Sequence, residues 1–158
     1  MRTISNLLFC VGLIFIFGCG DGNKSENDIT NNITGKWDLN SFEVTVKVSE
    51  NEMKLEGNKT NMRDIGGYNA NTTIFLPTGQ YEETYWLDND SIMFQPSGNW
   101  KDNGDSVLIL QNDPSEAVQA FLVKFKGDTM TFSGMVDWDQ DGESDDEYHG
   151  TYIKLGEI

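Results

Sequence analysis

Residues 137–147 read DWDQDGESDDE and hold seven carboxylates in eleven positions, between two segments with the alternation of β-strands. Carboxylate oxygens from alternate positions of a curling backbone can converge on one hard cation, and a glycine permits the sharp turn that this requires. The residues that fit this pattern are Asp137, Asp139, Asp141 and Gly142. Carboxylates this dense repel one another unless a cation or open water screens them. The segment is therefore either a calcium site or a solvated hairpin tip.

The spacing D-x-D-x-D-G resembles the calcium loop of EF-hand proteins. That resemblance implies a backbone carbonyl ligand at Glu143 and a further ligand at Asp145. An EF-hand carries a bidentate glutamate at its twelfth position, which is Tyr148 here, although Asp146 or Glu147 could substitute on a different path. The flanking segments have the pattern of strands rather than helices. We expect weak calcium binding, on the order of 10⁻⁴–10⁻³ M as in extracellular modules, that stiffens the hairpin.

Residue types that carry catalysis are sparse in the rest of the chain. The single histidine is His149, which opens the last predicted strand, and a Ser-His-Asp triad would have to use it. The sequence has no glycine-rich phosphate loop, no Cys/His zinc spacing and no dinucleotide fingerprint. Paired carboxylates could serve a glycosidase, but in so acidic a chain such pairs arise by chance. We therefore expect a protein that is not an enzyme.

The N-terminus has the composition of a secretory signal. Arg2 gives it a positive start, and an apolar run at 7–17 follows. The run is shorter than the ~20 apolar residues that cross a bilayer as a helix. Residues 16–19, IFGC, resemble the lipobox of bacterial lipoproteins, although Phe17 is bulkier than the usual residue. The alternatives are an ordinary cleaved signal or a buried apolar helix, with Cys19 unmodified in both.

The lipobox resemblance implies a signal peptide at 1–18 and lipid on the sulfur and amine of Cys19. Each buried methylene of such a lipid contributes ~0.8 kcal/mol, so several acyl chains anchor the protein durably. Residues 19–34 would form a flexible tether, because they are polar with almost no apolar side chain to bury. We expect an outer-membrane lipoprotein of the bacterial envelope, facing the periplasm or the cell surface. The net charge of −15 argues against nucleic acid and against adsorption to anionic head groups.

From Gly35 onward, apolar side chains recur at every second position, which predicts strands. The predicted strands cover 41–50, 71–76, 80–88, 92–95, two segments joined around Asn103-Gly104, 118–125, 129–136 and 146–155. Met53 to Leu55 form one more strand or belong to a loop over the barrel mouth. Eight or nine strands without an amphipathic helix favour an all-β fold, an antiparallel meander that closes into a barrel. A β-sandwich is the alternative.

The alternation in one strand leaves its orientation open. Tyr81 and Tyr85 point to one side of this strand, and Trp86 points to the other. One of these sets faces a core, and the other faces solvent or a ligand.

Gly35-Lys36-Trp37 opens the first strand and resembles the Gly-x-Trp motif of lipocalins and the wider calycin group. That resemblance implies that Trp37 closes the barrel floor beneath a basic side chain from a late strand, a role that Lys154 is placed to take. The second lipocalin motif and the helix that follows the barrel are missing. The domain at 35–158 therefore looks like the short lipocalin-like domains of bacterial lipoproteins. In the competing interpretation, Trp37 is an ordinary core aromatic of any β-domain.

Two functions follow from these features. The first is a lipid-anchored, non-catalytic binding or accessory module whose barrel holds a small, largely apolar ligand. The second is a calcium-stabilised interaction module with a filled core and no small ligand, which works through its surface.

Overall fold

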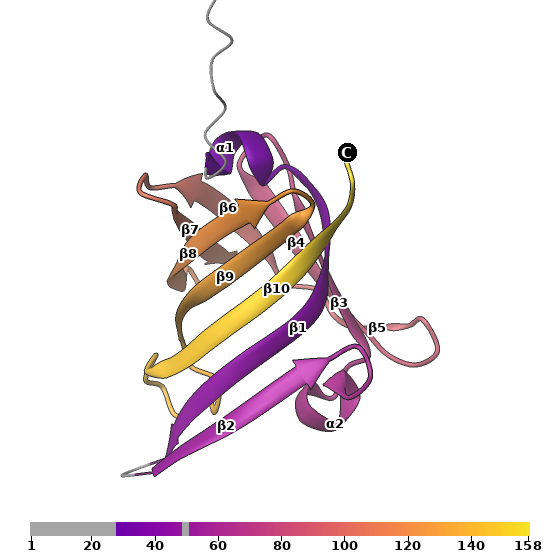
Figure 1. Ribbon diagram of the computed structural model, residues 1–158, viewed down its shortest axis with the longest axis vertical. Coiled ribbons are helices and arrows are strands. Elements are labelled where there is room, and N and C mark those ends of the chain that lie inside the picture. The colour runs from indigo at the N-terminus through magenta and orange to yellow at the C-terminus, as the bar shows by residue number, and fades with distance from the viewer. Residues whose placement is uncertain (1–27, 49–50) are drawn as a thin grey trace, which may run out of the picture.

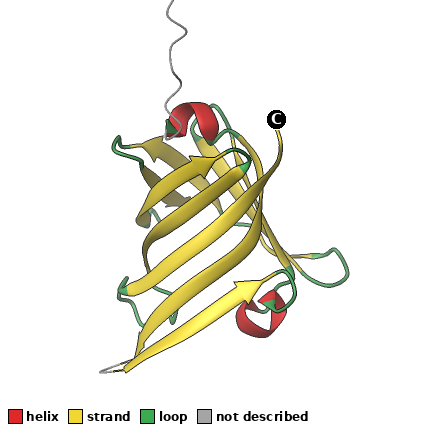
Figure 2. Cartoon of the chain, in the orientation of Figure 1, coloured by secondary structure: helices red, strands yellow, loops and turns green. Residues whose placement is uncertain are grey.

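The computed structural model describes residues 28–48 and 51–158 as an all-β chain (Figures 1 and 2). The elements are α1 (Ile29–Asn32), β1 (Gly35–Val48), β2 (Asn51–Asn58), α2 (Met62–Gly66), β3 (Ala70–Phe75), β4 (Gln80–Trp86), β5 (Ile92–Phe94), β6 (Ser97–Asp102), β7 (Val107–Asp113), β8 (Val118–Lys126), β9 (Thr129–Val136) and β10 (Asp146–Gly156). Within these described ranges, no helix is long and apolar enough to cross a membrane.

Eight antiparallel strands close into a barrel, which confirms the predicted fold and excludes the sandwich. Around the barrel, neighbouring strands follow the order β1, β3, β4, β6, β7, β8, β9 and β10. The barrel closes because β10 pairs with β1, from Lys36 opposite Gly156 to Thr45 opposite Glu147. Two strands lie outside the closed ring, since β2 pairs with β1 and β5 pairs with β4. The uncertain segment around residues 53–55 is thus a strand.

The two ends of the barrel differ because β1 changes partner along its length. Its first residues, Gly35 to Asp38, pair with β3. After an irregularity between Leu39 and Ser41, the rest of β1 pairs with β2 instead. The short helix α2 follows β2 and lies beside it, at the end of the barrel opposite α1 (Figure 1).

The helix α1 closes the other end and begins the folded domain. Ile29 and Ile33 lie one helical turn apart, and both side chains are buried in the core. The indole Nε1 of Trp37 donates a hydrogen bond of 2.6 Å to the carbonyl oxygen of Ile33. Residues 28–34, which were expected to belong to the tether, therefore include two side chains that are packed into the core. The predicted signal peptide and Cys19 lie outside the described residues.

The Gly-x-Trp motif lies at this closed end. The Nζ atom of Lys154 lies 5.5 Å from the centroid of the Trp37 ring. Gly35 adopts φ +136°, and a Cβ atom there would lie 2.8 Å from both the Gly156 carbonyl oxygen and the Lys154 Cε atom. Only glycine combines this backbone conformation with so close an approach of the lysine stem. The glycine thus lets Lys154 lie across the tryptophan.

Candidate functional site

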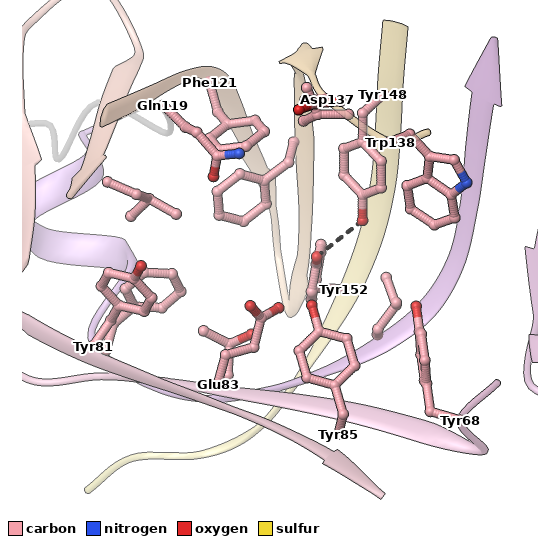
Figure 3. Close-up of a pocket in the computed structure, with 16 residues that line it drawn as sticks. Tyr68, Tyr81, Glu83, Tyr85, Gln119, Phe121, Asp137, Trp138, Tyr148 and Tyr152 are labelled. Carbon is pink, nitrogen blue, oxygen red and sulfur yellow. Dashed lines mark hydrogen bonds between the residues drawn. The ribbon is translucent and has the colours of Figure 1, made fainter. Parts of the chain in front are cut away.

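A partly enclosed cavity of about 240 Å³ lies inside the barrel (Figure 3). Its sixteen lining residues come from the inner faces of most barrel strands and from the loop after β9. They are Leu39, Tyr68, Thr73, Phe75, Tyr81, Glu83, Tyr85, Leu110, Gln119, Phe121, Phe132, Val136, Asp137, Trp138, Tyr148 and Tyr152. Side chains therefore fill only part of the barrel interior.

All five tyrosines of the chain line the cavity. On β4, Tyr81 and Tyr85 point inward with Glu83 between them. Trp86 lies on the outer face, where its Nε1 atom donates a hydrogen bond of 3.2 Å to the Thr72 hydroxyl. The orientation that alternation left open is thus settled, because the tyrosine set faces the interior.

Contacts between rings fix the aromatic wall. Tyr68 and Tyr85 meet edge to face with their ring centroids 4.8 Å apart. The hydroxyls of Tyr148 and Tyr152 share a hydrogen bond of 3.0 Å. Such edge-to-face pairs are worth about 0.5–1.5 kcal/mol beyond the area that they bury. The rings therefore hold one another in place around the cavity.

The tyrosine hydroxyls remain protonated at neutral pH. Burial, with the nearby Glu83 and Asp113 carboxylates, raises the pKa of Tyr81 to about 12. Burial also raises the pKa values of the other four tyrosines, since the phenolate form would lose its hydration. The cavity wall thus offers neutral phenols that can donate and accept hydrogen bonds.

Glu83 is the acidic group at the centre of this wall (Figure 3). Protein surrounds its carboxylate, although the cavity leaves part of the side chain accessible to a water-sized molecule. Burial raises the pKa of Glu83, and hydrogen bonds from Asn71 and Tyr85 offset part of that rise. The Asn71 Nδ2 atom donates to Oε1 at 2.9 Å. Glu83 therefore has no cationic partner among the residues that line the cavity.

Glycines on neighbouring strands make room for the large rings. Gly134 lies opposite Phe121 in the pairing of β8 with β9, and a Cβ atom there would lie 2.8 Å from the Phe121 ring. Gly57 lies opposite Phe42 in the pairing of β1 with β2, and its Cβ would overlap the Phe42 ring at 2.1 Å. A glycine inside a strand pattern can mark the close approach of a large neighbour, and Gly134 is such a signal beside the cavity residue Phe121.

The loop between β9 and β10 borders the cavity at the end opposite α1, where Asp137 and Trp138 belong to the lining. The buried Asp146 fixes this loop to β1. One carboxylate oxygen accepts a hydrogen bond from the Lys47 backbone N–H at 2.9 Å, and the other accepts from Trp138 at 2.8 Å and Asp139 at 3.4 Å. The position of Trp138 at the cavity thus depends on a single buried carboxylate.

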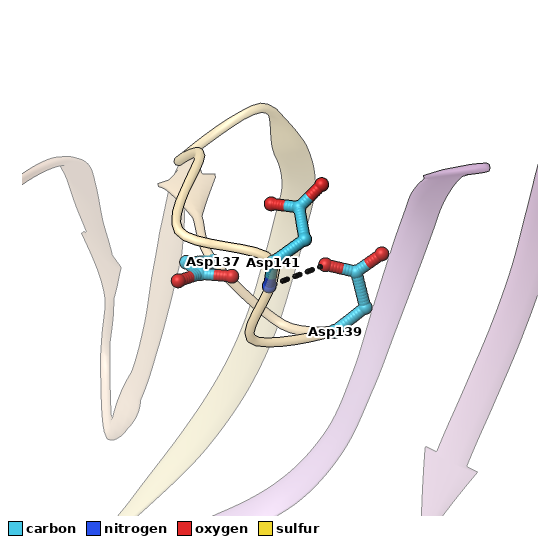
Figure 4. Close-up of side chains that lie close together, drawn as sticks. All are labelled: Asp137, Asp139 and Asp141. Atoms are coloured by element: carbon cyan, nitrogen blue, oxygen red, sulfur yellow. Dashed lines mark hydrogen bonds between the residues drawn. The ribbon is translucent and has the colours of Figure 1, made fainter. Parts of the chain in front are cut away.

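Three of the five predicted calcium ligands come together in this loop (Figure 4). One carboxylate oxygen from each of Asp137, Asp139 and Asp141 lies within 4.8 Å of the other two. Glu143 and Asp145 are not part of this group. Some loss of hydration and the neighbouring carboxylates, Asp141 first among them, raise the pKa of the exposed Asp139, although the hydrogen bond from the Asp141 backbone N–H offsets part of that rise. A cation between the three carboxylates would relieve this repulsion.

The candidates for the twelfth position of a calcium loop have other contacts. The Tyr148 ring lies inside the barrel, and Asp146 accepts backbone hydrogen bonds. Glu147 pairs with His149, its Oε1 atom lying 3.0 Å from Nε2 of the histidine. Of the ligand positions of an EF-hand loop, only the three carboxylates of Asp137, Asp139 and Asp141 therefore come together.

His149 lies on the outer face of the barrel with its side chain 46% exposed. Its Nδ1 atom lies 2.9 Å from the Ser133 hydroxyl, so serine, histidine and Glu147 form a short hydrogen-bonded row. None of the three lines the cavity. The row has the residue types of a triad, but it lies on an exposed sheet surface and away from the cavity.

Comparisons with family models and with curated proteins assign no family to this chain, so its architecture carries any functional assignment. No protein-family model matches the sequence, and no curated protein matches it significantly. What the chain does have is a closed, eight-stranded antiparallel barrel with an internal cavity, which is consistent with a lipocalin-like fold.

Proposed function

We propose that this protein is a non-catalytic binding module that holds a small ligand inside its barrel. The observation that supports this most strongly is the cavity of about 240 Å³, whose wall includes every tyrosine of the chain. A cavity of roughly 150 Å³ is enough for one benzene molecule. Tyrosine walls combine apolar faces with hydroxyl groups, so they suit a ligand with an apolar body and a polar group. The cavity also counts against the alternative of a filled core.

We further propose that the domain is held at the bacterial envelope by lipid on Cys19. The lipobox-like segment supports this, and so does the position of α1. The helix lies at the closed end of the barrel, so an anchor before it would attach there (Figure 1). The cavity border at Trp138 lies at the other end and would face away from the membrane. A mature chain without lipid mass on Cys19 would contradict the anchoring.

A neutral fluorescent probe tests ligand binding. We expect N-phenyl-1-naphthylamine to bind the folded domain with enhanced fluorescence, because its rings fit an aromatic cavity. Val136 lines this cavity, whereas its neighbour Met135 is 44% exposed. We expect Val136→Phe to fill the cavity and weaken uptake at least about tenfold, since little space remains for the probe.

The matched control is Met135→Phe, which adds a ring at an exposed position of the same strand. It should leave uptake unchanged. Equal uptake by both variants, with both folded, would place the probe outside the barrel and contradict the proposal.

Calcium binding by the acidic loop is a second candidate function, favoured by the three converging carboxylates of Asp137, Asp139 and Asp141. We expect a dissociation constant on the order of 10⁻⁴–10⁻³ M by calorimetry. Since the ion would bind only the folded loop, 10 mM calcium should raise the melting temperature by about 3–6 °C.

The loop variant Asp139→Asn/Asp141→Asn should lose both the heat and the shift. The control Asp128→Asn, in the turn between β8 and β9, should keep them. Without any heat or shift in the wild-type protein, the loop is a solvated hairpin tip.

A further inference from the structure

The charged groups that line the cavity are all acidic. Glu83 and Asp137 are both carboxylates, and the sixteen lining residues include no lysine, arginine or histidine. The Oδ1 atom of Asp137 is buried and has no hydrogen-bond partner. Burying an ionised carboxylate without an opposite charge is costly, so such groups are normally paired. In this cavity, the protein itself supplies no cation for either group.

Hydrogen bonds to Glu83 support its ionised form, although the loss of water around the side chain raises its pKa on balance. Asn71, a side chain only 1% exposed, donates an amide N–H to Oε1 rather than accepting a proton from it. A donor that points at a carboxylate stabilises the negative charge. The opposing effect is the loss of water around Glu83. A positive ligand group would compensate for that loss, and a neutral apolar ligand would not.

Aromatic rings provide the rest of a cation-binding environment. Tyr85 and Tyr152 lie near the Glu83 carboxylate in the cavity wall, and Tyr68 lies against Tyr85 on the side away from Glu83 (Figure 3). The faces of aromatic rings carry partial negative charge and attract cations within ≈ 6 Å of the ring centroid. Ammonium groups are recognised in proteins by such aromatic cages, which surround the cation while excluding water. A carboxylate within a tyrosine wall has this composition.

We propose that the barrel cavity selects a small organic cation, an alkylammonium or quaternary ammonium compound, with Glu83 as its counter-charge and the tyrosine rings as its wall. This inference rests on the proposed function, because it names the ligand class of the same cavity. The volume of about 240 Å³ admits such a group together with a short apolar body. Anionic ligands such as fatty acids would meet two carboxylates and are excluded by charge.

The test uses two compounds of the same shape, choline and 3,3-dimethylbutan-1-ol, in which a carbon replaces the charged nitrogen. We expect choline to bind at least about tenfold more tightly than the alcohol to the folded domain, because only the cation gains from Glu83 and the rings. Calorimetry or chemical-shift titration measures both constants. In Glu83→Gln, choline should lose at least about tenfold while the alcohol is unchanged.

The matched control is Glu82→Gln, on the same strand. Glu82 is exposed and accepts a hydrogen bond of 2.7 Å from the Gln95 side chain, so its replacement removes the same charge outside the cavity. This variant should keep choline binding within about twofold, since screened surface charge adds little. Equal losses in the two variants would mean that the overall negative charge attracts choline, and the proposal would be wrong.

Two further outcomes overturn the inference in distinguishable ways. Equal or tighter binding of the alcohol would show that charge is not selected, and the cavity would remain a site for neutral ligands. If choline fails to bind while N-phenyl-1-naphthylamine is still taken up, the cation inference fails and the proposed function stands. If neither binds, both fail.

Discussion

Glu83→Gln is expected to raise the melting temperature at pH 7 by roughly 3–8 °C, although it removes the group that we assign to ligand binding. The physical reason is the buried charge. Burial raises the pKa of Glu83, so the folded protein holds this proton more tightly than the unfolded chain does. Stability therefore falls as pH rises from the unfolded pKa toward the folded one. A glutamine at this position can still accept the hydrogen bond from the Asn71 amide. It carries no charge that would lose its hydration on folding.

The difference in melting temperature between Glu83→Gln and wild type is expected to depend on pH. At pH 4, Glu83 is largely protonated in both states, so wild type and variant should melt at similar temperatures. The difference should grow toward pH 7, which thermal melts at both values can measure. The ionisable groups around Glu83 are Tyr68, Tyr81, Tyr85, Tyr148, Tyr152 and Asp137. Because raised pKa values keep the tyrosines neutral over this range, they do not mask the titration.

Glu82→Gln is again the control, and it should change the melting temperature little at either pH. A Glu83→Gln protein that is less stable than wild type at pH 7 would mean that the carboxylate is needed for the fold. The role of its charge would then be structural, and the assignment of Glu83 to a ligand would lose its support.

Asp146→Asn should cost about 2–4 kcal/mol and lower the melting temperature by roughly 10 °C. Both carboxylate oxygens of Asp146 accept backbone hydrogen bonds, one from Lys47 and the other from Trp138. An asparagine has one oxygen, so its NH₂ group must face one of these donors and leave it unpaired. Chemical denaturation measures the loss, and the Trp138 fluorescence should change because its position at the cavity depends on this contact.

The neighbouring Asp145→Asn removes the same charge from a partly exposed side chain and should cost less than about 0.5 kcal/mol. A comparable loss in both variants would show that charge, rather than the pair of hydrogen bonds, explains the effect of Asp146. Such a result would contradict the view that Asp146 holds the loop in place.

Much of the fold was predictable because strand alternation is local. The alternation predicts Phe42, Val44, Val46 and Val48 on one face. The first three are buried in the core, whereas Val48, at the end of β1, is 49% exposed. Barrel closure is a different matter, since the pairing of β1 with β10 joins segments from opposite ends of the domain. Local patterns do not determine such a register, which is why a sandwich remained an alternative. The helix α1 was missed because its two isoleucines are isolated among polar residues, and their meaning depends on the barrel end that they cover.

The candidate site was less predictable than the fold. The alternation placed Glu83 on the same side as Tyr81 and Tyr85, but period two cannot tell an inner face from an outer one. Tyr148 and Tyr152 lie four positions apart on the last strand and so share a face, yet their meeting with β4 across the barrel follows from closure alone. The density of carboxylates in the acidic loop is visible in the sequence, whereas no local pattern marks Glu83 as a residue that lines a cavity.

The most direct test of ligand binding inside the barrel uses the tyrosines themselves. Since all five line the cavity, tyrosine-selective labelling with carbon-13 makes every labelled ring a reporter of its contents. During a titration with the neutral ligand 2-phenylethanol, we expect the tyrosine ring signals to shift and saturate. The indole N–H signal of Trp86, on the outer face, should stay in place. Tyrosine signals that remain unchanged at millimolar ligand, or shifts confined to Trp86, would contradict a binding site in the cavity.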